Sequence, residues 1–202
     1  MQFTLNGKKI NVIDSWEGLN FAQYLRIIKM GDDMVESLSI LTGIDYETLK
    51  KSKIKGLEKL LYAARFMNKA PKLQEKPTKI GKYKLPINFD IQFESLAQFE
   101  DMRQVMVKLE EGVYAQAESY AKYCAIYCQK LRDGEYDGQK ATDMISEIMT
   151  LPALEVISAG SFFFVRLQFL LNGIIPNSRS TPRSRRKATG KRSARRSAAM
   201  RK

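Results

Sequence analysis

Residues 114–131 read YAQAESYAKYCAIYCQKL, and small or aromatic side chains recur in this stretch every three or four positions. An α-helix turns once in about 3.6 residues, so this spacing places those side chains on one helical face. The face contains Tyr114, Ala117, Tyr120, Ala121, Cys124, Ala125, Cys128 and Leu131. We therefore predict one long helix here, within a fold that is mainly α.

Helical spacing continues on both sides of that stretch, from Leu96 onward. The preceding segment carries an apolar stripe of Phe99, Met102, Val105, Met106 and Leu109. Gly134 and Gly138 are expected to bracket a turn. The next helix carries Ala141, Met144, Ile145 and Ile148. Pro152 is predicted at the first position of a short helix, and Ser161 is predicted to cap the last helix.

The first twelve residues predict a β-hairpin. Apolar side chains alternate with polar ones on both sides of Asn6-Gly7, a pair that favours the left-handed backbone of a tight turn. The alternating residues are Phe3, Leu5, Ile10 and Val12.

Polar caps and terminal glycines delimit four helices between this hairpin and residue 70. An Asn or Asp before a helix can accept a hydrogen bond from a first-turn N–H, and a glycine can end the helix. Asn20 and Gln23 have the spacing of a capping box. The expected helices are 20–30 before Gly31, a second from Asp32 or Asp33 to Gly43, a short turn from Asp45 to Lys50, and about 54–68.

A linker and a second β-element follow. Residues 71–78 include two prolines, and residues 80–87 read as a turn-containing strand pair closed by Pro86. Ala22-Gln23-Tyr24 and Ala97-Gln98-Phe99 occupy similar positions after the two hairpins. This similarity marks either a duplicated hairpin-plus-helix unit or a chance match between unrelated elements.

The expected architecture is therefore mainly α with two small β-hairpin elements, an α+β fold with a helical body. Residues 1–70 form the first hairpin and its helices, and 71–78 form the linker. Residues 79–175 form a second hairpin plus a helical lobe that shares one core with the first part. Residues 176–202 are expected to form a disordered basic tail.

The positive charge is concentrated in that tail. The chain has a net charge of +12, and residues 179–202 contain eleven Lys or Arg and no Asp or Glu, which leaves +1 elsewhere. Their low apolar content cannot offset the entropy of ordering the backbone, so disorder is expected. The residues expected to contact nucleic acid or an acidic partner are Arg179, Arg183, Arg185, Arg186, Lys187, Lys191, Arg192, Arg195 and Arg196.

Catalysis and metal binding are not expected from this sequence. The chain has no histidine, which removes the most common general base and metal ligand. Cys124 and Cys128 lie four residues apart and read as a buried pair without the further ligands that zinc needs. We therefore expect no enzyme activity, no catalytic residue, no cofactor and no metal.

The most apolar stretch runs from Ser161 to Ile175 and contains Arg166. At about 15 residues it is too short and too polar to span a membrane, and no membrane partner is expected. It is predicted to be a buried C-terminal helix or a helix docked into a partner's groove. The residues expected to bind a partner are Phe162, Phe163, Phe164 and Phe169.

Several motifs resemble a known class of proteins. They are the hairpin at 3–10, the helix entry at 16–25 (WEGLNFAQYL) and the helix end at 38–44 (LSILTGI). Together these segments resemble tail assembly chaperone-like proteins from the structural-gene regions of tailed phages, most closely over the first 70 residues. The resemblance implies a non-enzymatic helical protein that binds the hydrophobic tape-measure protein in the host cytoplasm. The arginine-rich tail departs from that class and leaves a place in the virion open.

Two functions follow as expectations. The first is an assembly protein that binds an apolar helical partner, which the nine methionines favour because their side chains repack readily. The second is a nucleic-acid-associated virion structural protein whose basic tail binds DNA without sequence specificity. The oligomeric state is left open by the sequence.

Overall fold

Helices dominate the part of the chain that the computed structural model describes, which comprises residues 2–5, 8–52, 54–85, 95–108 and 112–171. The first half contains β1 (Gln2–Leu5), β2 (Lys8–Asn11), the 3₁₀ turn η1 (Trp16–Gly18), α1 (Phe21–Met30), α2 (Met34–Thr42), α3 (Tyr46–Lys50), α4 (Ile54–Ala63) and η2 (Ala64–Asn68). The second half contains β3 (Lys79–Ile80), β4 (Tyr83–Lys84), α5 (Leu96–Val107), α6 (Val113–Asp133), α7 (Gly138–Thr150) and α8 (Ala153–Leu171). The predicted class, mainly α with two small β-hairpins, is confirmed.

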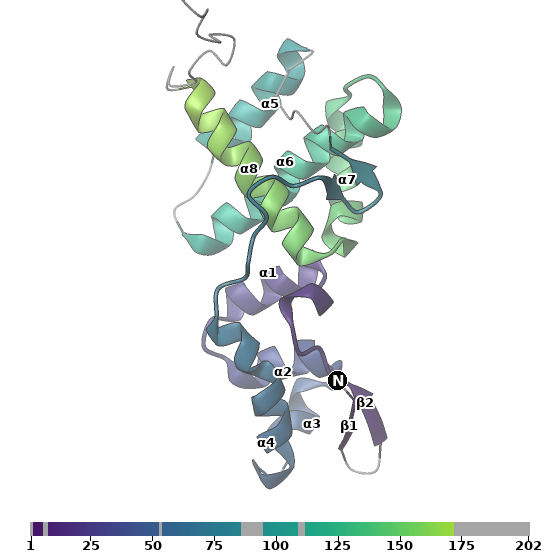
Figure 1. The fold of residues 1–202 in the computed structure, drawn as a ribbon, viewed down its shortest axis with the longest axis vertical. Helices are drawn as coiled ribbons and strands as arrows, with labels where there is room; N and C mark the ends of the chain where they lie inside the picture. Colours follow the sequence, from purple (N-terminus) through teal and green to yellow (C-terminus); the bar gives the residue numbers. More distant parts are fainter. Residues whose placement is uncertain (1, 6–7, 53, 86–94, 109–111, 172–202) are drawn as a thin grey trace, which may run out of the picture.

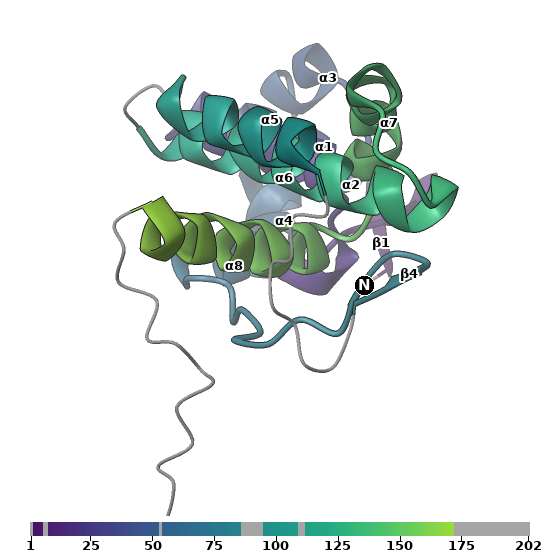
Figure 2. The ribbon, with the colours of Figure 1, turned by 90° about the horizontal axis from the view of Figure 1, so that it is seen from above.

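These elements form an elongated molecule. Figure 1 shows β1–β2 and α1–α4 towards one end of the long axis and α5–α8 towards the other. In the view of Figure 2, α5, α6 and α8 run alongside one another. The buried residues of both halves belong to a single hydrophobic cluster, so the chain has one continuous core.

The caps predicted for the first helices are present. Asn20 and Gln23 form both bonds of the capping box: the Gln23 amide donates to Asn20 Oδ1 at 2.8 Å, and the Asn20 amide donates to Gln23 Oε1 at 3.0 Å. Asp33 and Asp45 accept from first-turn amides in α2 and α3. The antiparallel hairpin pairs Phe3 with Ile10, as expected, and its predicted turn at 6–7 lies outside the described residues.

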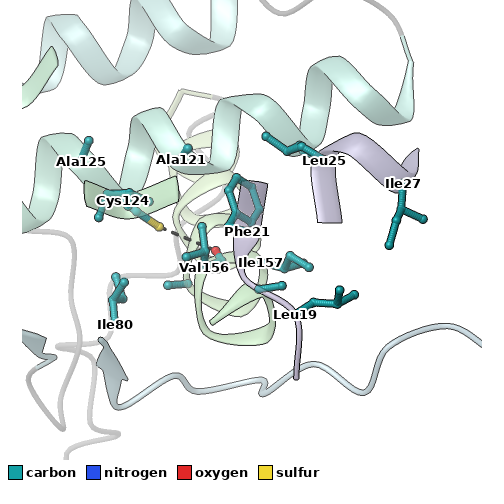
Figure 3. Packing of buried hydrophobic residues seen from close by; sticks show 14 of the residues in the cluster. Leu19, Phe21, Leu25, Ile27, Ile80, Ala121, Cys124, Ala125, Val156 and Ile157 are labelled. Atoms are coloured by element: carbon teal, nitrogen blue, oxygen red, sulfur yellow. Dashed lines mark hydrogen bonds between the residues drawn. The ribbon is translucent and has the colours of Figure 1, made fainter. Parts of the chain in front are cut away.

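The two halves are joined by backbone hydrogen bonds next to the start of α1. The Phe21 amide donates to the Leu151 carbonyl at 2.9 Å, and the Ala153 amide donates to the Leu19 carbonyl at the same distance. Leu19 and Phe21 are fully buried beside Val156 and Ile157 of α8 (Figure 3). The entry of α1 is therefore fixed to the junction between α7 and α8.

Helices α6 and α8 approach each other closely at Gly160. A Cβ atom added at Gly160 would lie 2.2 Å from Tyr120 Cβ and 2.7 Å from Tyr120 Cα. Real Cβ atoms do not approach so closely, so only glycine fits here unless the backbones separate. Next to this contact, the Cys124 thiol faces the Val156 carbonyl at 3.7 Å, which Figure 3 shows.

Two carboxylates fix the β3–β4 hairpin to the helices. Glu155 of α8 binds Lys79 Nζ at 2.9 Å and accepts from the Gly81 amide at 2.7 Å. Glu147 of α7 binds Lys82 Nζ at 2.9 Å and accepts from the Tyr83 hydroxyl at 3.0 Å. Each strand has only two residues, so its backbone hydrogen bonds alone are too few to hold the hairpin in place. The side-chain contacts of Glu155 and Glu147 add the missing stabilisation.

Two sequence predictions about element ends are confirmed and a third is wrong. The helix expected over 54–68 is present, α-helical to Ala63 and 3₁₀ from Ala64 to Asn68. Gly134 ends α6 and Gly138 is the first residue of α7, so the two glycines bracket the connection between these helices. Ser161 caps no helix, because α8 runs without a break from Ala153 to Leu171 and the Ser161 hydroxyl donates to the Ser158 carbonyl instead.

The two units of the suggested duplication share one of the two hydrogen bonds of the capping box. Ser95 accepts from the Gln98 amide just as Asn20 accepts from the Gln23 amide. However, Gln98 Oε1 is buried and has no hydrogen-bond partner among the described residues, whereas Gln23 Oε1 completes its capping box. The similar triplets therefore place glutamines in different environments.

Replacing Gly160 with alanine tests the α6–α8 contact. Helix propensity alone predicts a gain of about 1 kcal/mol, because alanine is the better helix former. Steric overlap with Tyr120 predicts a net loss of about 1–3 kcal/mol. Urea unfolding of Gly160→Ala should show that loss, whereas Gln168→Ala, at an exposed position of α8, should change stability by less than about 0.5 kcal/mol. A Gly160→Ala protein as stable as the parent would contradict the contact.

Acid should weaken the hairpin attachment. The hydrogen bond from Lys82 lowers the pKa of Glu147 in the folded state, although partial burial opposes this. A group with a lowered folded pKa stabilises the fold above its unfolded pKa, and this stabilisation disappears as pH falls through the folded value. Glu147→Gln should therefore lower stability at neutral pH by about 1 kcal/mol or less and flatten the loss of stability in acid. Thermal unfolding of both proteins from pH 7 to pH 3 measures this, and parallel curves would exclude the effect.

Candidate partner-binding surface

Apolar side chains gather on the last turns of α8. Val165 is 44% exposed, Phe169 43%, Leu170 37% and Leu171 42%. We call these four residues the α8 terminal patch. A group of exposed large apolar side chains within one helical segment can mark a surface that another molecule covers.

The helical period places two of these four residues, Val165 and Phe169, opposite the packed face of α8. Phe163 and Leu167, four residues apart, are fully buried. The Phe163 ring lies 4.9 Å from the Tyr127 ring of α6, measured between centroids. Val165 and Phe169 are also four residues apart, but they follow Phe163 and Leu167 by two positions, which is about 200° around the helix. The packing of α8 on α6 therefore turns Val165 and Phe169 outward. Leu170 and Leu171 follow Leu167 by three and four residues, so they continue the packed face beyond the buried part of the helix.

The four phenylalanines predicted to bind a partner are in different environments. Phe163 is a core residue with no exposed surface, so its predicted role in partner contact does not fit the fold. Phe162 and Phe164 are half-buried; the Arg166 guanidinium lies 5.3 Å from the Phe162 ring centre, and Phe164 packs near Tyr123. Phe169 is exposed and lies within the patch.

Sequence reasoning missed Val165, Leu170 and Leu171. The signal that could have found Val165 is the phase of α8, because an unbroken helix with Phe163 and Leu167 inside must place Val165 and Phe169 outside. Leu170 and Leu171 share the face of Leu167, so this phase does not indicate their exposure. The prediction of a helix boundary at Ser161 obscured that phase. The residues expected to bind nucleic acid or an acidic partner through the tail, 179–196, lie outside the described part of the chain.

By length and composition α8 could cross a membrane. It is a 19-residue helix with a mean hydropathy of 1.5 in its most apolar window, of which 39% is buried inside the protein. This corrects the expectation of a stretch too short to span, because the apolar helix begins at Ala153 and not at Ser161. Packing against α6 accounts for the apolar character of its buried face.

The two cysteines are in the core. Cys124 and Cys128 have no exposed surface, and burial raises the pKa of the Cys128 thiol to about 12 and that of Cys124 well above its usual value. A thiol must ionise to act as a nucleophile or a metal ligand, so burial makes these two side chains unreactive packing groups. Within the described ranges no three Cys, Asp or Glu side chains gather as metal ligands.

A cavity of about 650 Å³ lies between α5, α6 and α7. Its wall includes two acids, Asp101 and Glu118, and two bases, Lys108 and Lys122, so its charges balance. The Tyr136 hydroxyl donates to Asp101, and burial is the main cause that raises the pKa of Tyr136 above its usual value. Tyr136 is therefore a hydrogen-bond donor at neutral pH and not a base.

No protein-family model, curated protein or solved structure matches this chain. The resemblance to tail assembly chaperone-like proteins thus remains an expectation that rests on short motifs. A function for this protein has to be inferred from its own residues, of which the α8 terminal patch and the distribution of charge are the most informative.

Proposed function

We propose that this protein is a non-enzymatic assembly protein, of the tail assembly chaperone type, that binds an apolar helical partner through the α8 terminal patch. The expected partner is a phage tape-measure protein, bound during virion assembly in the host cytoplasm. The observation that carries the proposal is the exposure of Val165, Phe169, Leu170 and Leu171 on one short segment.

The patch has the form of one side of a helix–helix contact. Val165 and Phe169 are spaced by four residues, so they form a ridge along α8 that can pack against a second apolar helix. An exposed aromatic ring between aliphatic side chains is typical of the few residues that dominate binding energy. A convex ridge of this kind suits an extended helical partner better than a small molecule, which requires a cavity.

The methionines support this proposal less than their number suggests. Met102 and Met144 are buried core residues. Met30 and Met34, at the facing ends of α1 and α2, are 41% and 48% exposed and remain available to a partner.

Co-expression with a tape-measure protein tests the proposal. The parent protein should keep that partner soluble and co-purify with it, because the patch covers apolar helices that would otherwise aggregate. Phe169→Ser combined with Val165→Ser should reduce the recovered complex at least about tenfold, as expected for loss of a central aromatic contact.

Val113→Ser is the matched control, because Val113 is 69% exposed at the start of α6, outside the patch. It should leave the amount of complex unchanged. Equal recovery with the patch variant, or no complex with the parent protein, would contradict the proposal.

The second candidate function is a nucleic-acid-associated virion structural protein. It is favoured by the eleven bases and no acids between residues 179 and 202. Such a charge density predicts binding to any DNA sequence that weakens steeply between about 50 and 200 mM salt. Cutting the chain after Asn177 should lower DNA affinity at least about tenfold; undiminished affinity of the shortened chain would rule this function out for the tail.

A further inference from the structure

Positive charge is also concentrated in one segment of the folded body. Residues 50–84 contain twelve Lys or Arg and only two acids, Glu58 and Glu75, a net charge of +10. Residues 1–178 together carry a net charge of +1, so the body outside residues 50–84 carries a net charge of −9. The near-neutral sum therefore conceals a strong separation of charge between two parts of one folded unit.

The basic residues follow a continuous path on the surface. Figure 1 shows α4, η2, the connecting segment 69–78 and the β3–β4 hairpin one after another along the near side of the molecule. Six exposed bases on this path define what we call the basic strip: Lys59, Arg65, Lys69, Lys72, Lys76 and Lys84. Lys79 and Lys82 lie on the same path but are held by Glu155 and Glu147.

The six strip residues keep their charge available. Within the described part of the chain, none of them lies within the 4.0 Å that defines an ion pair with a carboxylate. Unpaired, exposed cations concentrated along one path attract a polyanion and release its counterions on binding. The path includes an irregular segment in which Lys69, Lys72 and Lys76 recur every three or four residues, a spacing of at most about 14 Å in an extended chain.

An aromatic ring lies within the strip. Tyr62 is 64% exposed, and the Arg65 guanidinium lies 4.9 Å from the centre of its ring. Lys59, Tyr62 and Arg65 are three residues apart, so they follow one side of the α4–η2 segment. An unpaired nucleobase can stack on an exposed aromatic ring. The neighbouring phosphates of the strand can then bind the basic side chains on either side of that ring.

We propose that the basic strip, with Tyr62, is a binding site for single-stranded nucleic acid. A narrow line of cations with a stacking ring suits a flexible single strand, whose bases are free to stack. An anionic membrane is less well matched, because lipid-binding surfaces need a broad apolar face beside the cations. This site is separate from the α8 terminal patch and from the tail, so it goes beyond the function proposed above.

The test measures binding of a fluorescent oligo(dT) by the full-length chain over a range of salt concentrations. In the strip variant, Lys69, Lys72 and Lys76 are replaced by glutamine. Its affinity should fall at least about tenfold, and the slope of log K against log salt should decrease by about 2, since each lost phosphate contact contributes about 0.7. Tyr62→Ala should lower affinity about fivefold or more without changing that slope.

The matched control replaces Lys9, Lys29 and Lys108 by glutamine, which removes the same net charge from β2, α1 and the C-terminal end of α5. These three lysines are also exposed and, within the described part of the chain, have no carboxylate within 4.0 Å. The control should bind the oligonucleotide within about twofold of the parent affinity, and all variants should unfold at the same urea concentration, since surface substitutions change stability little.

Three results would overturn the proposal. An equal loss of oligo(dT) affinity in the strip variant and the control would show that only the net charge of the protein matters. Equal affinity for duplex DNA and oligo(dT), both unaffected by Tyr62→Ala, would exclude a single-strand site. Binding to vesicles of anionic lipid that depends on the strip, without strip-dependent binding of oligo(dT), would assign the surface to a membrane.

Discussion

The packing of α6 on α8 is the contact on which the rest of the fold depends. Gly160 presents no side chain to Tyr120, and small residues beside it, Ala121 and Cys124 on α6, keep the two helices close. That approach puts Phe163 and Leu167 into the core and fixes the rotation of α8 about its axis. Dense packing of this kind cannot absorb even one added methyl group without a shift of the backbone. The orientation of every other residue of α8 follows from this one constraint.

The proposed functions follow from that orientation. With α8 fixed in this rotation, Val165 and Phe169 face outward and form a ridge, while Glu155 faces the β3–β4 hairpin and holds it through Lys79. The hairpin in turn fixes the end of the connecting segment 69–78, whose beginning is held by the hydrogen bond from Trp16 Nε1 to the Lys69 carbonyl at 3.0 Å. The same helix pair therefore positions both an apolar surface and a basic one, and the two surfaces suit different kinds of partner.

Local signals in the sequence were sufficient to predict most helices and both hairpins. Packing between distant segments determines which side chains of these elements are exposed. The capping box at Asn20 and the left-handed helix end at Gly43 involve neighbouring residues only, so they could be predicted. Ser161 carries the same capping chemistry but lies within a helix, because burial of the apolar residues on either side outweighs a local preference. The burial of Phe163 depends on how distant segments pack, so local patterns did not show it. The charge separation between residues 50–84 and the rest of the body can be counted in the sequence, but a sum of charges over the whole chain hides it.

The most direct measurement of the central contact is the nuclear Overhauser effect between the α-protons of Gly160 and the β-protons of Tyr120 in the folded protein. The packing described here predicts a strong cross-peak, because a Cβ at Gly160 would lie only 2.2 Å from Tyr120 Cβ. Absence of that cross-peak in a folded sample with both residues assigned would show that α6 and α8 do not meet at this point. The orientation of α8, and with it the outward-facing ridge, would then have to be abandoned.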